Sequence, residues 1–200
     1  IHQELGHLAD KTYRNLERAL ESFSKQSEDM AEKVFSEEKS INYIASEIVR
    51  FLVKLQAMTE ISDTERLEIF RVHEVVSNIE RIGDHAENLA EQAQYMVEHG
   101  LQFSTTGADD LKSISDSVLK SFQYAIDARQ NGNMEAVRKV SQYEDDVDSQ
   151  EEELREKHIE RLSAGECKAS AGVVFLDIIS NLERVSDHAY NLAGYVKDEM

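Results

Sequence analysis

The sequence predicts an all-α protein whose six helices form two tandem antiparallel three-helix bundles related by a pseudo-twofold axis. Apolar residues recur at steps of three and four along nearly the whole chain, which is the period of an amphipathic helix. The 200 residues include no proline and only eight glycines, so long helices can run without interruption. One stretch of sequence also occurs twice, which indicates an internal duplication.

The first repeat is expected to span residues 1–103 and to hold three helices. Their apolar series cover about residues 5–23, 31–55 and 67–93. The third helix is expected to begin at Ser62, because Glu65 stands three residues later as in a capping box. It is expected to end near Gly100, which would make it roughly 55 Å long at about 1.5 Å per residue.

The second repeat is expected to span residues 107–200, after the loop-like stretch 104–107. Its helices are expected over about residues 109–130, 134–162 and 174–192. The Asn-Gly-Asn sequence at residues 131–133 predicts a tight turn between the first two of them. Ser163 and Glu166 have the spacing of a second capping box ahead of the last helix.

The duplication is clearest in two segments that lie 103 residues apart. Residues 78–90 read NIERIGDHAENLA and residues 181–193 read NLERVSDHAYNLA, so nine residues recur in step. The preceding helices match at a shift of 106 residues. The matched acidic or amide pairs of those helices are Asp10 with Asp116, Glu38 with Glu144 and Asn42 with Asp148. The difference between the two shifts falls in turns, where chain length varies most easily.

The charge balance excludes several classes of partner. The formal net charge is −18, from 40 acidic and 22 basic residues, so the surface repels phosphate backbones and anionic lipid headgroups. Neither nucleic-acid binding nor direct lipid insertion is expected.

No apolar stretch approaches the roughly 20 residues of a membrane span. The single cysteine, Cys167, excludes an internal disulfide and fits a reducing compartment.

The recurring acidic residues are the candidate ligands of a metal ion. Core packing explains why apolar positions recur, but it does not explain recurring carboxylates. Residues four apart project from one helix face and can share a ligand. The candidate residues are Glu80, Asp84, Glu183, Asp187, Asp10, Asp116, Glu38 and Glu144. If the helices pack antiparallel, three carboxylate flanks would line one groove in each repeat, beside the apolar stripes.

Two interpretations of these carboxylates stay open at this point. Oxygen-rich clusters suit hard cations such as Mg²⁺, Mn²⁺, Ca²⁺ or iron ions, and a bound cation relieves the repulsion between the acids. Alternatively, the acids form a solvated face on which Arg81 and Arg184 make ordinary pairs with Asp84 and Asp187. No other cofactor is indicated.

The remaining polar residues and motifs give little indication of catalysis. His85 and His188, with Asn78 and Asn181 on the same flank, are expected to serve helix packing and hydrogen bonding rather than metal ligation. The chain has no phosphate-binding loop, Cys-x-x-Cys pair or nucleophile elbow. An enzyme built on a carboxylate-bound metal is the weakest of the functional classes considered, and a non-catalytic protein is expected.

Glu80-Arg-Ile-Gly-Asp84 and Glu183-Arg-Val-Ser-Asp187 resemble the duplicated E(D)-x-x-x-D motif of PhoU proteins. The resemblance covers both repeats. It implies a regulatory role in phosphate transport, with metal binding at the motif carboxylates in some members. Residues 41–55 and 78–90 are most similar to the PhoU-like cytosolic C-terminal domain of bacterial sodium-dependent phosphate cotransporters.

The resemblance therefore predicts a regulatory domain on the cytoplasmic side of the membrane, attached to a transport domain of the same polypeptide. The start at Ile1 in place of Met agrees with such a longer chain. The alternative is a free-standing cytoplasmic PhoU regulator that works with a separate phosphate transporter. Either arrangement leaves a homodimer open.

Overall fold

The computed structural model describes residues 1–58 and 61–197 and contains six helices and no strand in that part of the chain. The helices are α1 (His2–Lys25), α2 (Glu28–Gln56), α3 (Asp63–Glu98), α4 (Thr105–Asn131), α5 (Met134–Ser163) and α6 (Ala169–Lys197). The all-α prediction is confirmed. No helix of the described chain is both long and apolar enough to cross a membrane.

Polar side chains cap the first turns of α2, α3, α4 and α5. The predicted capping box is present at α3, where the Ser62 hydroxyl accepts from the Glu65 amide and the Glu65 carboxylate accepts from the Ser62 amide. The predicted turn at residues 131–133 is also present. Gly132 ends α4 with φ 62°, and the Asn133 side chain accepts from the first amides of α5.

Two boundary predictions are wrong. Residues 105–107 are not a loop but the first turn of α4, because the Ser104 hydroxyl accepts from the Gly107 amide and caps the helix. Ser163 does not cap α6. It is the last residue of α5, and its hydroxyl donates to the carbonyl oxygen of Ile159, one turn earlier.

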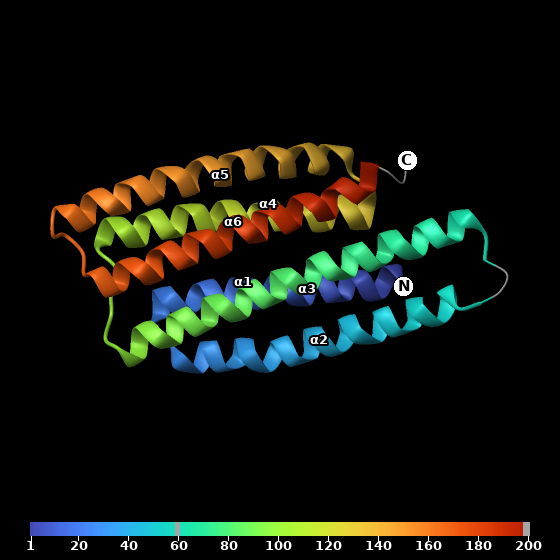
Figure 1. Ribbon diagram of the computed structural model, residues 1–200, viewed down its shortest axis with the longest axis horizontal. Coiled ribbons are helices and arrows are strands. Elements are labelled where there is room, and N and C mark those ends of the chain that lie inside the picture. Colours follow the sequence, from blue (N-terminus) through green and yellow to red (C-terminus); the bar gives the residue numbers. More distant parts are fainter. Residues whose placement is uncertain (59–60, 198–200) are drawn as a thin grey trace.

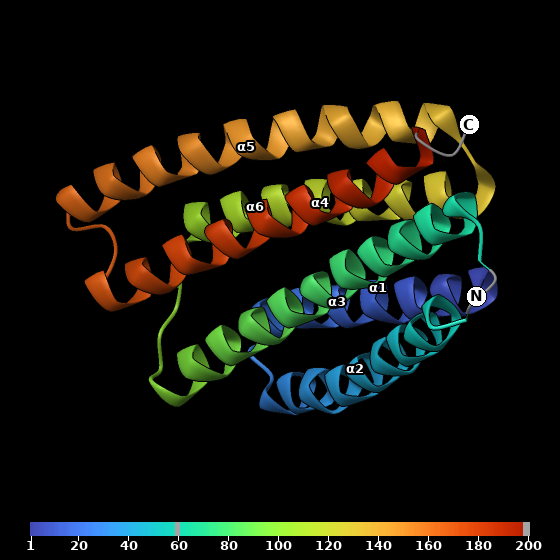
Figure 2. The same cartoon turned by 45° about the vertical axis from the view of Figure 1, so that its right-hand side comes forward.

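The helices pack as two antiparallel trios that lie side by side (Figures 1 and 2). Within the trios, α1, α2 and α3 contact one another, as do α4, α5 and α6. The trios meet through α3 against α6 and α1 against α4, so α2 and α5 lie on opposite outer sides. One continuous apolar core joins both halves. The repeated face of α3 is therefore shared between α2 on one side and α6 on the other.

The junction of α3 and α6 has a matching pair of hydrogen bonds. His85 Nδ1 lies 2.8 Å from Asn181 Oδ1, and His188 Nδ1 lies 3.0 Å from Asn78 Oδ1. The two imidazole rings stack across the junction with centroids 5.7 Å apart. The prediction that these histidines and asparagines serve helix packing and hydrogen bonding is confirmed. Each histidine bonds to the asparagine of the other helix, so an approximate twofold axis relates the two repeats.

Candidate metal sites

The first acidic site lies between α2 and α3 and is built around Glu38. Glu38 follows Val34 and precedes Ile41 in the buried row of α2, and it is 1% exposed. The expectation that it lies beside the apolar stripe is wrong, because it lies within the stripe. The carboxylates of Glu80, Asp84 and Glu87 on α3 act on it electrostatically. Four carboxylates of two helices therefore act on one another here, although no three of them present oxygens within 4.8 Å of one another.

Glu38 is a buried carboxylate without a hydrogen-bond partner. Neither of its oxygens has a partner among the described residues. Burial, followed by repulsion from Asp84, Glu87 and Glu80, raises the pKa of Glu38 to about 7, while the amide of Asn15 acts in the opposite direction. A charged group in such a place is unfavourable unless a proton or a cation neutralises it.

The neighbouring acids of α3 also have raised pKa values. Burial and the charge of Asp84 raise the pKa of Glu80, which Arg81 partly offsets. Burial, Glu91 and Asp84 raise the pKa of Glu87, which Lys39 partly offsets. Mutual repulsion of this kind is what a hard cation would relieve.

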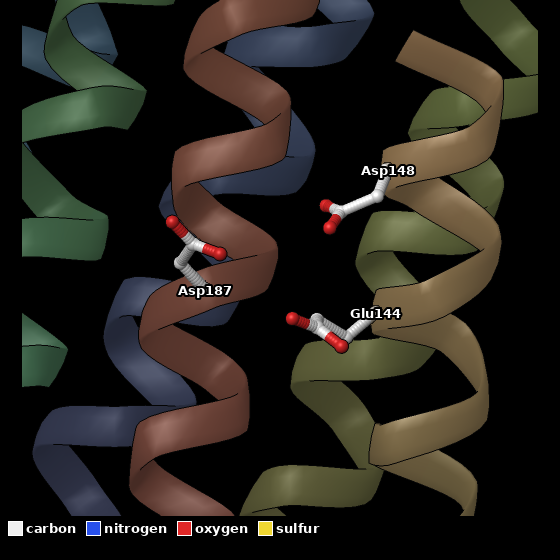
Figure 3. Close-up of side chains that lie close together, drawn as sticks. All are labelled: Glu144, Asp148 and Asp187. Atoms are coloured by element: carbon white, nitrogen blue, oxygen red, sulfur yellow. The ribbon is translucent and has the colours of Figure 1, made fainter. Parts of the chain in front are cut away.

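The second acidic site lies between α5 and α6. Glu144, Asp148 and Asp187 each present a carboxylate oxygen, and these oxygens lie within 4.8 Å of one another. Figure 3 shows Glu144 and Asp148 reaching from α5 toward Asp187 on α6. Burial and the neighbouring acids raise the pKa of both Glu144 and Asp148. Carboxylate oxygens at this spacing can coordinate one cation together.

Glu183 joins the edge of the second site. Burial and the charge of Asp187 raise its pKa, and Arg184 partly offsets this. Arg184 Nε lies 3.9 Å from Glu183 Oε2, and within residues 1–58 and 61–197 Arg81 makes no ion pair with Asp84 and Arg184 none with Asp187. Pairing within each helix therefore leaves most of this acidic charge unneutralised.

The structure does not bring Asp10 and Asp116 to either site. Asp10 lies against α4, in a groove with Arg14 and Gln130. Asp116 lies on α4, where it pairs with Lys112 at 2.6 Å. The expectation of three carboxylate flanks in each groove is wrong, because α1 and α4 turn these acids toward each other's helix and away from α2 and α5. Each site is lined by two helices.

Asp148 was missed as a candidate, although the sequence carried a signal for it. Glu144-x-x-x-Asp148 on α5 has the same spacing as Glu183-x-x-x-Asp187 on α6. Two such pairs on adjacent helices place four carboxylates across one groove. The first repeat has Asn42 at the position of Asp148, and Glu87 of α3 supplies its fourth carboxylate instead.

Comparisons with known proteins agree with this architecture. A family model described as the PhoU domain matches residues 5–93 and 111–196. The phosphate-specific transport system accessory protein PhoU homolog 1 of Thermotoga maritima is 28% identical over 91% of this chain and 78% of its own length. The accessory protein PhoU homolog of Clostridium acetobutylicum is 25% identical over 96% of this chain and 87% of its own length.

Solved structures show the same fold. The crystal structure of PhoU from Pseudomonas aeruginosa superposes with a TM-score of 0.90 at 23% identity, covering 97% of this chain and 92% of the other. The phosphate transport system regulatory protein PhoU from Streptococcus pneumoniae superposes with a TM-score of 0.83 at 21% identity, covering 97% and 90%. Because the family model matches most of the chain and the helical architecture agrees with it, the protein belongs to the PhoU family.

Proposed function

We propose that this protein is a non-catalytic accessory protein that regulates a phosphate transport system and binds hard cations at its two acidic sites. The regulatory part is supported by its similarity to proteins named as accessory proteins of phosphate-specific transport. These names favour the free-standing regulator over the cotransporter domain that the sequence suggested first. The partner would be a phosphate transporter, reached from the cytoplasmic side of the membrane.

The observation that carries the cation proposal is the isolation of Glu38. An interior carboxylate that is 1% exposed and has no hydrogen bond of normal geometry to either oxygen is unfavourable in its charged form. It faces further carboxylates rather than a lysine or arginine. Mg²⁺, Mn²⁺, Ca²⁺ or Fe³⁺ would take oxygen ligands from Glu38, Glu80, Asp84 and Glu87, and from Glu144, Asp148, Glu183 and Asp187 in the second site.

Calorimetric titration tests the cation proposal. Metal-free protein is titrated with Mn²⁺, Mg²⁺, Ca²⁺ and Fe³⁺, and the Asp84→Ala, Asp187→Ala double variant is titrated alongside it. Binding heat is expected for the wild type and should be largely lost in the double variant. An Asp10→Ala, Asp116→Ala variant removes the same amount of charge outside the two acidic sites. It should bind these cations as the wild type does. Equal heats in all three proteins would contradict the proposal.

Phosphate uptake by cells tests the regulatory proposal. In the source organism, deletion of the gene is expected to change the rate of phosphate uptake at high external phosphate, and the wild-type gene should restore it. A variant with four neutralised site residues (Glu80→Gln, Asp84→Asn, Glu183→Gln, Asp187→Asn) should fail to restore it. A matched control with four exposed acids neutralised (Glu17→Gln, Glu32→Gln, Glu156→Gln, Glu160→Gln) should restore it. Uptake that the deletion leaves unchanged would refute the regulatory role.

A further inference from the structure

We propose that the residue between the two motif acids, Gly83 in α3 and Ser186 in α6, makes the two cation sites unequal. Gly83 opens a deep site in which Glu38 holds a cation tightly. Ser186 closes the corresponding space, so the second site is shallow and binds a cation more weakly. This inference rests on the proposed cation binding and adds a specificity-determining position that is not itself a ligand.

The first step is the contact at Gly83. A Cβ atom built on Gly83 would lie 2.9 Å from Glu38 Oε2 and 3.0 Å from Glu38 Oε1, which is closer than such atoms approach. Gly83 is itself buried in the middle of α3, where glycine costs about 1 kcal/mol relative to alanine. Because Gly83 has no side chain, the Glu38 carboxylate can lie directly against the backbone of α3.

The second step is what this space does to the ligand. Glu38 is 1% exposed and its oxygens have no partner in the described chain, so water does not solvate the carboxylate. When a cation binds, the buried carboxylate has little hydration of its own to lose, and the contact forms where attraction between opposite charges is strong. Glu80, Asp84 and Glu87 would complete the ligand set from the more open side.

The third step is the contrast in the second repeat. Ser186 occupies the position of Gly83, is completely buried, and its hydroxyl has no hydrogen-bond partner. Glu144, the counterpart of Glu38, stays partly exposed, and Asp148 beside it is exposed. Figure 3 shows these two side chains extending from α5 toward Asp187 on α6. Water therefore reaches the second set of ligands and competes with the cation for them.

The experiment exchanges the two residues in single-site backgrounds. Asp148→Asn with Asp187→Asn leaves only the first site, and Glu80→Gln with Asp84→Asn leaves only the second. Mn²⁺ affinity is measured by calorimetry in each background, and circular dichroism melting confirms folding. The first site is expected to bind at least about tenfold more tightly than the second, since supporting residues commonly change metal affinity by about 10- to 100-fold.

Gly83→Ser in the first background is expected to weaken Mn²⁺ binding about tenfold or more, by pushing Glu38 outward. Ser186→Gly in the second background is expected to strengthen binding by a similar factor. The end of a flexible side chain can move away from the new Cβ, so Gly83→Ser should fold. If it does not, Gly83→Ala in the same background adds only the Cβ atom that would crowd Glu38 and should also weaken binding.

Matched controls separate this effect from helix stability. Gly194→Ser adds a serine to α6 where no atom lies within 4 Å of the new Cβ, and Ser46→Gly removes an exposed serine from α2. Both should change Mn²⁺ affinity less than about twofold. Equal affinities of the two wild-type sites, or binding that neither the change at Gly83 nor the change at Ser186 alters, would overturn this inference and leave cation binding intact. Absence of Mn²⁺ binding to the wild type would overturn both.

Discussion

The two repeats carry the same acidic motif but hold it in different surroundings. In the first repeat the central carboxylate, Glu38, is sealed against the backbone of α3 at Gly83. In the second repeat the corresponding Glu144 remains partly exposed and shares a cluster with Asp148 and Asp187. Duplication thus preserves three of the four carboxylates of each site, while one neighbouring position changes how far water reaches them. Burial, rather than motif identity, sets the electrostatics of each site.

The junction between the repeats gives the opposite lesson. There the two copies keep almost the same geometry, since each histidine bonds to the asparagine of the other helix at 2.8 or 3.0 Å. Asn78 and Asn181 also donate to backbone carbonyls one turn earlier, each at 2.8 Å, which leaves their Oδ1 atoms to accept from His Nδ1–H. Contacts shared by both repeats stay symmetric because each copy constrains the other.

The largest expected effect comes from Glu38→Gln in metal-free protein. Glu38 has a folded pKa of about 7, raised from 4.5. The folded chain therefore keeps a proton that the unfolded chain loses, and this contribution to the free energy of unfolding disappears as pH rises from about 4.5 through 7. One pKa unit is worth about 1.4 kcal/mol, so the wild type loses about 3 kcal/mol across this window.

Glu38→Gln removes that loss. In chelator at pH 8.5, urea unfolding should find the variant about 2–3 kcal/mol more stable than the wild type, and at pH 4.5 the two should be similar. Glu144→Gln is the matched change in the second repeat. It should alter stability by less than about 1 kcal/mol, because the Glu144 carboxylate is partly solvated. Equal effects of the two substitutions would remove the contrast between the sites.

The next largest effect concerns His188 at the junction of α3 and α6, where stability is lost as pH falls instead of as pH rises. Burial, followed by the charges of His85, Arg81 and Arg184, lowers the pKa of His188 from 6.5 to about 4. The unfolded chain takes up a proton first, so stability is lost as pH falls from about 6.5 toward 4. His188→Gln should reduce this loss by about 2 kcal/mol in urea unfolding at pH 4.5. Substitution of the exposed His7 by Gln should not reduce this loss. If the free energy of unfolding depended on pH equally in the wild type and in His188→Gln, the role given to His188 would be contradicted.

The smallest effect concerns Ser186. Its buried hydroxyl has no partner, and leaving such a group unsatisfied costs about 1 kcal/mol or more. Ser186→Ala should therefore raise the free energy of unfolding by about 1 kcal/mol, part of which is helix propensity. Ser149→Ala on the exposed face of α5 isolates that part and should gain about 0.5 kcal/mol or less. A destabilised Ser186→Ala would mean that the hydroxyl does have a partner.

The sequence alone determined the features that depend on local spacing. The period of the apolar residues fixed the six helices, and short-range chemistry fixed the capping box at Ser62 and the turn at residues 131–133. The motif pairs Glu80 with Asp84, and Glu183 with Asp187, could be found because residues one turn apart share a helix face whatever the tertiary structure is.

Only the tertiary structure decided which helix faces which. Local spacing placed Glu38 in the row of Val34 and Ile41, but it did not say which helix would cover that row. Packing turned Asp10 toward α4 and buried Glu38 under Gly83. The same packing brought Asp148 to Asp187. Burial and the approach of distant carboxylates depend on contacts between residues far apart in the chain, so the charge state and depth of each site follow from the assembled bundle.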